Sequence, residues 1–166
     1  MKGALSIMLV DSNLPVDRDR LKNRLIRLVK EDEEILGCFF GGSIGDQSED
    51  FYSDIDARIV VKEGINLKRK QLDVIRSIGE YLFIETMKDN YSVIHYSTFI
   101  KLDLFIYTVE MLEPSIWLKN ISIVKDFGLL AQLSHDSKEL SYQITQEEFD
   151  DLINKYYAYY FELYRC

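Results

Sequence analysis

Acidic residues set within strand-forming segments limit the folds open to this chain more than any other feature. Asp54 and Asp56 lie on either side of Ile55 and open a run rich in β-branched residues, and Asp103 lies in the segment Lys-Leu-Asp-Leu-Phe-Ile. Because side chains alternate between the two faces of a strand, the two neighbouring carboxylates point to the same side, opposite apolar residues. We therefore expect a sheet with an acidic patch on one face and a core on the other.

A glycine turn precedes these acids. Phe39 and Phe40 end an apolar segment that runs directly into Gly41-Gly42-Ser43. Glycine lets the backbone approach phosphate closely, and a serine hydroxyl with nearby backbone N–H groups can bind phosphate oxygens. Alone, Gly-Gly-Ser is more often merely a turn. Together with the carboxylates, it indicates a site for a metal ion and a phosphate.

A purely structural explanation of the acids is the alternative. A buried carboxylate without a partner costs free energy, so Asp54 and Asp56 could instead pair with Arg58 or Lys101, or mark the wet end of a strand. An isolated Asp-x-Asp pair favours this explanation. The upstream glycine turn and a third acid on another strand favour the metal–phosphate site.

Composition and charge exclude several classes of protein. The 166 residues are 47% hydrophobic and 29% charged, which is typical of a globular domain with a substantial core. The formal net charge of −8 argues against general nucleic-acid binding, which normally needs a basic face. The apolar stretch near the N-terminus is too short to span a membrane and has no signal-cleavage site. Cys38 and Cys166 form neither a metal pattern nor a disulfide framework, so we expect a reduced, cytoplasmic setting.

Hydrophobic periodicity predicts a mixed α/β unit. Apolar residues recur at helical spacing over residues 17–34 and 67–83, and a brief helix is expected near residues 114–118. Strand-like segments occupy residues 37–40, 54–61, 92–98, 101–108 and 121–125. The segments 92–98 and 101–108 are expected to form a hairpin, and residues 46–53 a polar loop.

A tyrosine-rich helix is predicted at the C-terminal end. Thr145 and the acidic residues after it form a helix cap that complements the helix dipole. An apolar stripe of helical period follows, at Phe149, Leu152, Ile153, Tyr156 and Tyr160. Such a helix needs a surface to pack against. We expect it to cover the α/β unit, to form a homodimer with a second chain, or to begin a helical domain.

The glycine turn and the acidic strand resemble the motif of the nucleotidyltransferase superfamily, which includes DNA polymerase beta. The matching segments are Phe40-Gly41-Gly42-Ser43-Ile44-Gly45-Asp46 and Tyr52-Ser53-Asp54-Ile55-Asp56-Ala57-Arg58-Ile59-Val60-Val61. They are most similar to the branch that adenylylates aminoglycoside or lincosamide antibiotics. The resemblance implies an α/β (α+β) fold, with a mixed β-sheet flanked by helices and followed by a C-terminal helix. Residues 1–140 would be the catalytic domain, and residues 141–166 the tyrosine-rich helix that begins a substrate or dimerisation domain.

The resemblance also implies a reaction and a role for each motif residue. A hydroxyl of a small molecule, expected to be an aminoglycoside-like antibiotic, attacks the α-phosphate of ATP and pyrophosphate leaves. Gly42 and Ser43 hold the nucleotide phosphates, and Asp54 and Asp56 bind Mg²⁺. Asp103 binds the catalytic metal or accepts the hydroxyl proton. The expected protein is thus a Mg²⁺-dependent adenylyltransferase of antibiotic resistance.

The chain departs from the antibiotic-modifying pattern in two ways. Many relatives carry an arginine shortly after the Gly-Ser, whereas residues 44–50 contain no basic residue. The charge of a triphosphate must then be met by metal, backbone dipoles or a more distant Arg or Lys. Relatives usually append a helical domain, and here only one strong helix follows the catalytic unit. In this branch a separate glutamate can be the general base, but Glu85 and Glu162 are both better explained as surface residues.

Two other functions stay open from the sequence. Minimal nucleotidyltransferase antitoxins have a similar motif in a short chain and modify a protein hydroxyl. A non-catalytic nucleotide-binding or assembly module would keep the fold as a scaffold and use the aromatic helix as its interface. Three clustered carboxylates argue against a scaffold, which has no need of them.

Other conspicuous residues favour structural roles. His95 and His135 have no Cys or His companion at metal spacing. Trp117 fits a packing role, with purine stacking as the alternative, and the basic run at residues 68–70 fits a solvated helix face. The tyrosines of residues 156–164 fit a packing or dimer face better than a ligand cage.

Overall fold

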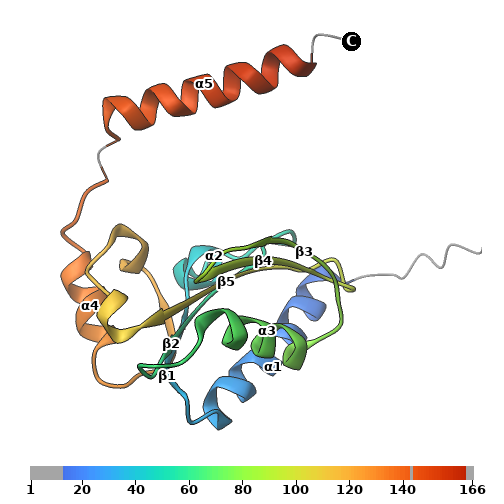
Figure 1. Ribbon diagram of the computed structural model, residues 1–166, viewed down its shortest axis with the longest axis vertical. Coiled ribbons are helices and arrows are strands. Elements are labelled where there is room, and N and C mark those ends of the chain that lie inside the picture. The colour runs from blue at the N-terminus through green and yellow to red at the C-terminus, as the bar shows by residue number, and fades with distance from the viewer. Residues whose placement is uncertain (1–12, 143, 164–166) are drawn as a thin grey trace, which may run out of the picture.

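Six strands form one mixed sheet in the order β3-β4-β5-β2-β1-β6 (Figure 1). The computed structural model describes residues 13–142 and 144–163, with side chains of residues 13–142 and 144–154. The strands are β1 (Ile35–Phe40), β2 (Ile55–Val61), β3 (Tyr81–Met87), β4 (Tyr91–Tyr96), β5 (Lys101–Thr108) and β6 (Ser122–Lys125). Strands β2 and β5 pair in parallel, and the other pairs are antiparallel. The predicted mixed α/β class is therefore confirmed.

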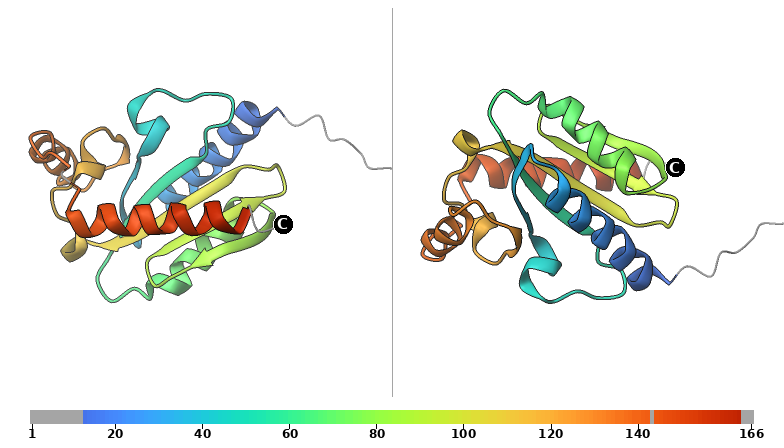
Figure 2. Two further views of the ribbon diagram at one scale, coloured as in Figure 1. Left: turned by 90° about the horizontal axis from the view of Figure 1, so that it is seen from above. Right: turned by 90° about the horizontal axis from the view of Figure 1, so that it is seen from below.

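Two helices cover one face of this sheet. Figure 2 shows α1 (Leu14–Glu31) and α3 (Leu67–Ile78) crossing the face that is seen from below. Their buried residues pack on the apolar side of the central strands and form the main core, which includes Leu25, Val29, Val74, Ile75, Ile59, Leu104 and Ile106. Pro15 lies in the first turn of α1, where its missing N–H needs no partner. The Asn66 side chain caps α3 by accepting a hydrogen bond from the Arg69 N–H at 2.9 Å.

The helix expected over residues 67–83 is shorter than predicted. It ends at Ile78, and after Gly79 the chain turns into β3, which pairs with β4. The predicted helix extends to Phe83 because Leu82 continues its apolar spacing, but the hydrogen bonds with β4 hold this segment in the sheet. The hairpin of β4 and β5 is confirmed, with Ile94 opposite Leu102.

Short elements beyond β5 form a second, smaller core. They are the 3₁₀ turns η1 (Val109–Met111) and η2 (Ile116–Leu118), and α4 (Leu130–Ser137), a helix that the sequence did not predict. Leu118, Leu130 and Leu133 pack on Phe39 and Val60, on the sheet face opposite α1 and α3. This cluster covers one end of that face.

The C-terminal helix α5 (Gln146–Leu163) is present as predicted from Thr145 onward. Figure 1 shows it standing apart from the sheet, on the side opposite α1 and α3. The apolar side chains of its first half are exposed: 47% for Phe149, 41% for Leu152 and 40% for Ile153. The side chains of the tyrosines at 156–164 lie outside the described part. Within residues 13–142 and 144–163, no helix combines the length and apolarity that crossing a bilayer requires.

Candidate functional site

Two of the predicted acids face each other across the parallel pair of strands. Asp56 of β2 and Asp103 of β5 are direct register partners, and their side chains lie on the sheet face away from α1 and α3. Asp54 directly precedes β2. The residues that alternate with these acids point to the other face and are at most 1% exposed: Ile55, Ala57, Leu102 and Leu104. The predicted alternation of acidic and apolar faces is confirmed.

The glycine turn lies against the Asp56 carboxylate. The Gly41 N–H donates a hydrogen bond to the backbone oxygen of Asp56 at 3.0 Å, which ties the end of β1 to β2. Gly42 follows with a φ of +54°, and a Cβ at this position would overlap Oδ2 of Asp56. Both the conformation and the contact therefore require glycine. Gly42 and Ser43 open a short helix, α2 (Gly42–Asp46).

A buried arginine on α1 holds the loop that carries Asp54. The Nη1 atom of Arg18, a residue 5% exposed, donates to the backbone oxygens of Asp50 at 2.7 Å and Ser53 at 3.0 Å. The Asp50 side chain closes the loop further by accepting hydrogen bonds from the Tyr52 N–H and the Ser53 hydroxyl. Arg18 is not among the residues predicted for the site, although its spacing with Leu21 places it on the buried side of α1.

The ammonium group of Lys101 lies between the carboxylates of Asp54 and Asp103. Its Nζ lies 2.6 Å from Oδ2 of Asp54 and 3.5 Å from Oδ2 of Asp103. Burial lowers the pKa of Lys101, but the two carboxylates outweigh it and raise the pKa above its ordinary value. The structural alternative considered for Asp54, a pairing with Lys101, is therefore realised. A cation already occupies the space between these carboxylates, which shows that they favour positive charge.

The acids of this site are difficult to ionise together. Burial, and then the charges of Asp54 and Asp103, raise the pKa of Asp56 above its ordinary range. Burial raises the pKa of Asp103 as well, against the opposing effect of Lys101. Oδ1 of Asp103 is buried and has no hydrogen-bond partner among the described residues. An additional cation at this face would relieve all three of these costs.

The carboxylate oxygens of this site suit a divalent ion that prefers oxygen ligands, such as Mg²⁺. Asp56 and Asp103 offer carboxylates from adjacent strands, and Oδ1 of Asp103, which has no hydrogen-bond partner among the described residues, is an oxygen that could bind such an ion. Among the described side chains of residues 13–142 and 144–154, however, no three His, Cys, Asp or Glu side chains are gathered closely enough to hold a metal ion. Asp56 and Asp103 are thus the pair that fits a cation, while Asp54 is engaged by Lys101.

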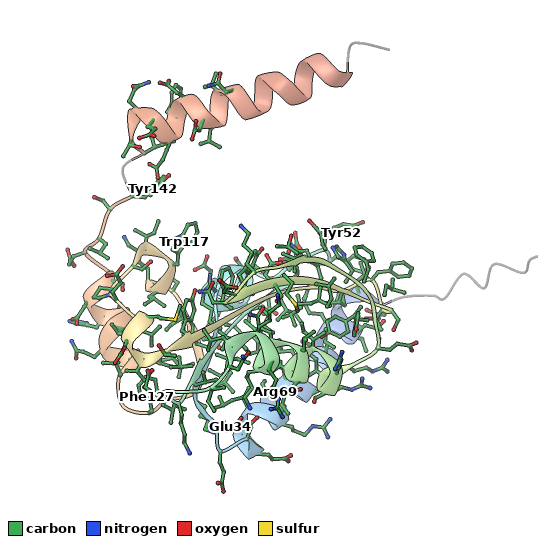
Figure 3. All side chains as sticks on the ribbon, in the orientation of Figure 1. Glu34, Tyr52, Arg69, Trp117, Phe127 and Tyr142 are labelled. Atoms are coloured by element: carbon green, nitrogen blue, oxygen red, sulfur yellow. The ribbon has the colours of Figure 1, made fainter. Side chains whose placement is uncertain are left out.

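A cavity of about 450 Å³ opens on the same sheet face, beyond the acids. Its walls combine a guanidinium with aromatic and apolar side chains, among them Arg58, Phe39, Phe105, Tyr107 and Trp117. Trp117 is 68% exposed at its rim, on the side of the sheet shown uppermost in Figure 3, so the packing role expected for it is wrong. Arg58 follows Asp56 by two residues and therefore projects from the same side of β2.

The remaining candidates lie outside this constellation. Glu85 of β3 pairs with His95 of β4 at 2.7 Å, which gives both residues a structural partner. The side chain of Glu162 lies outside the described part. The expected solvated face at residues 68–70 is wrong for Lys70, which is 6% exposed and lies 2.8 Å from Asp32. Figure 3 shows Arg69 on the side of the molecule opposite Trp117.

Comparison with protein-family models gave no match, and comparison with curated proteins gave no significant match.

Proposed function

We propose that this protein is a Mg²⁺-dependent nucleotidyltransferase that transfers AMP from ATP to a hydroxyl of a small molecule. The observation that carries the proposal is the register of Asp56 and Asp103 on adjacent parallel strands, with Gly42 packed on the Asp56 carboxylate. Two strand-borne carboxylates beside a glycine turn suit a reaction at phosphorus. The resemblance of the motif supports the same chemistry, and an aminoglycoside-like antibiotic in the cytoplasm is the first acceptor to test.

Each residue of the site would have its own role in this reaction. The acceptor oxygen forms a bond to the α-phosphorus, the bond from that phosphorus to the β-phosphate oxygen breaks, and pyrophosphate leaves. Asp56 and Asp103 would hold Mg²⁺, which when bound neutralises charge on the phosphates. Asp103 is also a candidate acceptor for the hydroxyl proton. Gly42 and Ser43 would bring backbone N–H groups and a hydroxyl to the phosphates.

Transfer of label from ATP tests this function. The purified protein is incubated with ATP labelled at the α-phosphate, Mg²⁺ and a panel of aminoglycosides, and products are separated and identified by mass. We expect labelled antibiotic that disappears when EDTA is added. Asp56→Asn and Asp103→Asn should each lower the rate about a hundredfold or more, because each removes a charged ligand of the ion.

Asp73→Asn is the matched control for these variants. Asp73 is an exposed residue of α3, the helix on the opposite face of the sheet from Asp56, and its only ion pair among the described residues is a long contact of 3.8 Å with Arg69. This variant should keep full activity. Transfer that survives both Asp56→Asn and Asp103→Asn would refute the proposed site, and absence of labelled antibiotic with intact ATP binding would refute the acceptor.

A protein hydroxyl is the second candidate acceptor. The exposed apolar residues Phe149, Leu152 and Ile153 on α5 favour it, because such a surface suits another chain better than a polar antibiotic. The same helix would serve the homodimer considered from the sequence. Intact-mass measurement of proteins that co-purify with the chain distinguishes the two acceptors, since a modified partner gains the mass of one AMP group.

A further inference from the structure

The backbone conformation at Gly41 does not explain why this residue is glycine. Its φ of −106° and ψ of −157° lie in a region open to every residue type. A Cβ on Gly41 would, however, overlap Nη1 of Arg58. Glycine at 41 therefore makes room for a guanidinium, just as Gly42 makes room for the Asp56 carboxylate. Strand β2 thus places the Arg58 guanidinium against Gly41 and the Asp56 carboxylate against Gly42.

Arg58 is buried without full use of its donors. It is 9% exposed, and its guanidinium carbon lies 4.9 Å from the centre of the Phe105 ring. Phe105 is in turn stacked on Tyr91, with ring centres 4.4 Å apart, so the guanidinium lies against a fixed aromatic surface. Its Nη1 has no hydrogen-bond partner among the described residues. A buried donor without a partner costs free energy unless a ligand satisfies it.

The charges around Arg58 leave it available to a ligand. It forms no ion pair with a carboxylate of the described residues, whereas Lys101 is held by Asp54 and Asp103. The loop after Ser43 brings no positive charge, because residues 44–50 contain neither Arg nor Lys. Arg58 also lines the open cavity, in which Glu113 is the one acidic lining residue and is exposed at the rim. Arg58 is therefore part of the wall that a ligand in this cavity would contact.

We infer that Arg58 binds a phosphate of the nucleotide, next to the glycine turn, and replaces the positive charge that the loop after Ser43 lacks. This inference rests on the proposed function for the identity of the ligand. A guanidinium offers donors in a planar fork that matches two oxygens of a phosphate. Its place two residues from Asp56 puts it beside the carboxylates that would hold the metal.

Inorganic tripolyphosphate isolates this contact from the rest of the nucleotide. Binding of Mg²⁺–tripolyphosphate and of adenosine to the full chain is measured by calorimetry for the wild type, Arg58→Met and Arg58→Lys. We expect Arg58→Met to weaken tripolyphosphate binding about ten- to a hundredfold, which is the loss of a charge-assisted contact, and to leave adenosine binding unchanged. Arg58→Lys should recover part of the affinity, because a point charge replaces the fork.

Two further variants keep the result interpretable. Arg76→Met removes the same charge from an exposed position on α3 and should leave tripolyphosphate affinity unchanged. Gly41→Ala displaces the guanidinium without removing it. As a single substitution it should weaken tripolyphosphate binding, and combined with Arg58→Met it should cause no further loss. This second route also applies if Arg58→Met does not fold.

The inference is overturned if folded Arg58→Met binds tripolyphosphate like the wild type, if Gly41→Ala does so, or if the wild type does not bind tripolyphosphate. Loss of adenosine affinity alone would also overturn it and would assign Arg58 to the nucleobase. These outcomes differ from a failure of the proposed function, because binding of tripolyphosphate is measured without any transfer to an acceptor.

Discussion

Gly42 illustrates how a single residue type serves backbone and site together. Its positive φ admits other residues only at a cost, and the Asp56 carboxylate fills the space of a side chain. The carboxylate and the turn are therefore positioned by each other. Replacement of either changes the other.

Gly42→Ala should destabilise the protein by more than the 1–2 kcal/mol that a left-handed conformation costs an ordinary residue. The added methyl group would also displace Asp56 and lower Mg²⁺-dependent transfer. Urea unfolding and the labelled-ATP assay measure the two effects. Gly64→Ala is the matched control, because Gly64 has a φ of +80° but open space around its Cβ position. Equal losses in the two variants would show that the contact with Asp56 contributes nothing.

Asp126 stabilises the start of α4 through its charge. Its Oδ1 accepts hydrogen bonds from the N–H groups of Gly128 at 2.9 Å and of Leu129 and Leu130 at 3.1 Å. Burial opposes ionisation of Asp126, but these N–H groups outweigh it and lower its pKa below the ordinary value of 3.8. The ionised carboxylate is thus more favourable in the folded protein than in the unfolded chain.

Asp126→Ala should lower the free energy of unfolding at pH 7 by about 1 kcal/mol, as expected for loss of a capping side chain. Because the folded pKa is depressed, the stabilisation is present above pH 3.8 and is lost as the pH falls through the folded pKa. Urea unfolding at pH 7 and at pH 3 measures this change. Glu139→Ala, an exposed acid after α4, should show no comparable effect. A difference between wild type and Asp126→Ala that does not shrink at low pH would contradict the charge-based explanation.

At the scale of elements, α1 and the loop over residues 47–54 act as one unit. Arg18 reaches from the buried side of the helix to two backbone oxygens of that loop. The loop leads directly into Asp54 and β2. The helix therefore helps to hold the loop that leads into Asp54, although β1 and α2 lie between the two in the sequence.

Arg18→Met should lower the free energy of unfolding by about 1–3 kcal/mol, because two backbone oxygens of the loop lose their hydrogen bonds to a charged donor. Hydrogen exchange of residues 47–54 should also become faster. Arg20→Met is the control on the same helix, since the Arg20 side chain is 70% exposed and pairs only with the neighbouring Asp17 among described residues. Unchanged exchange in Arg18→Met would show that the loop is held by its own internal hydrogen bonds.

At the scale of the whole molecule, α5 is set apart from the sheet that carries the acids. The described side chains of the helix are exposed, and Figure 1 shows the helix away from the sheet. The apolar side chains of its described first half therefore contribute little to the core of the α/β unit. Their burial requires another surface.

Removal of residues 144–166 should change the free energy of unfolding of the α/β unit by less than about 0.5 kcal/mol, the range of ordinary surface changes. Thermal unfolding followed by circular dichroism measures this quantity. A large loss of stability in the shortened chain would show that α5 packs on the sheet in solution. Leu118→Ala is the positive control. Leu118 belongs to the second core, so its truncation should lower the free energy of unfolding by about 2–5 kcal/mol.

The sequence by itself determined the local features: the α/β class, the helix over most of residues 14–31, the hairpin of β4 and β5, and the shared face of Asp54 and Asp56. These follow from periodicity and turn chemistry, which depend only on neighbouring residues. The tertiary structure decided the partners. It placed Asp56 opposite Asp103, paired Lys101 with Asp54, and put residues 81–83, the end of a predicted helix, into β3. The contacts of Arg18 with the loop and of Arg58 with Phe105 were likewise decided by the tertiary structure. Contacts between distant strands and helices depend on register and packing, which no local pattern encodes.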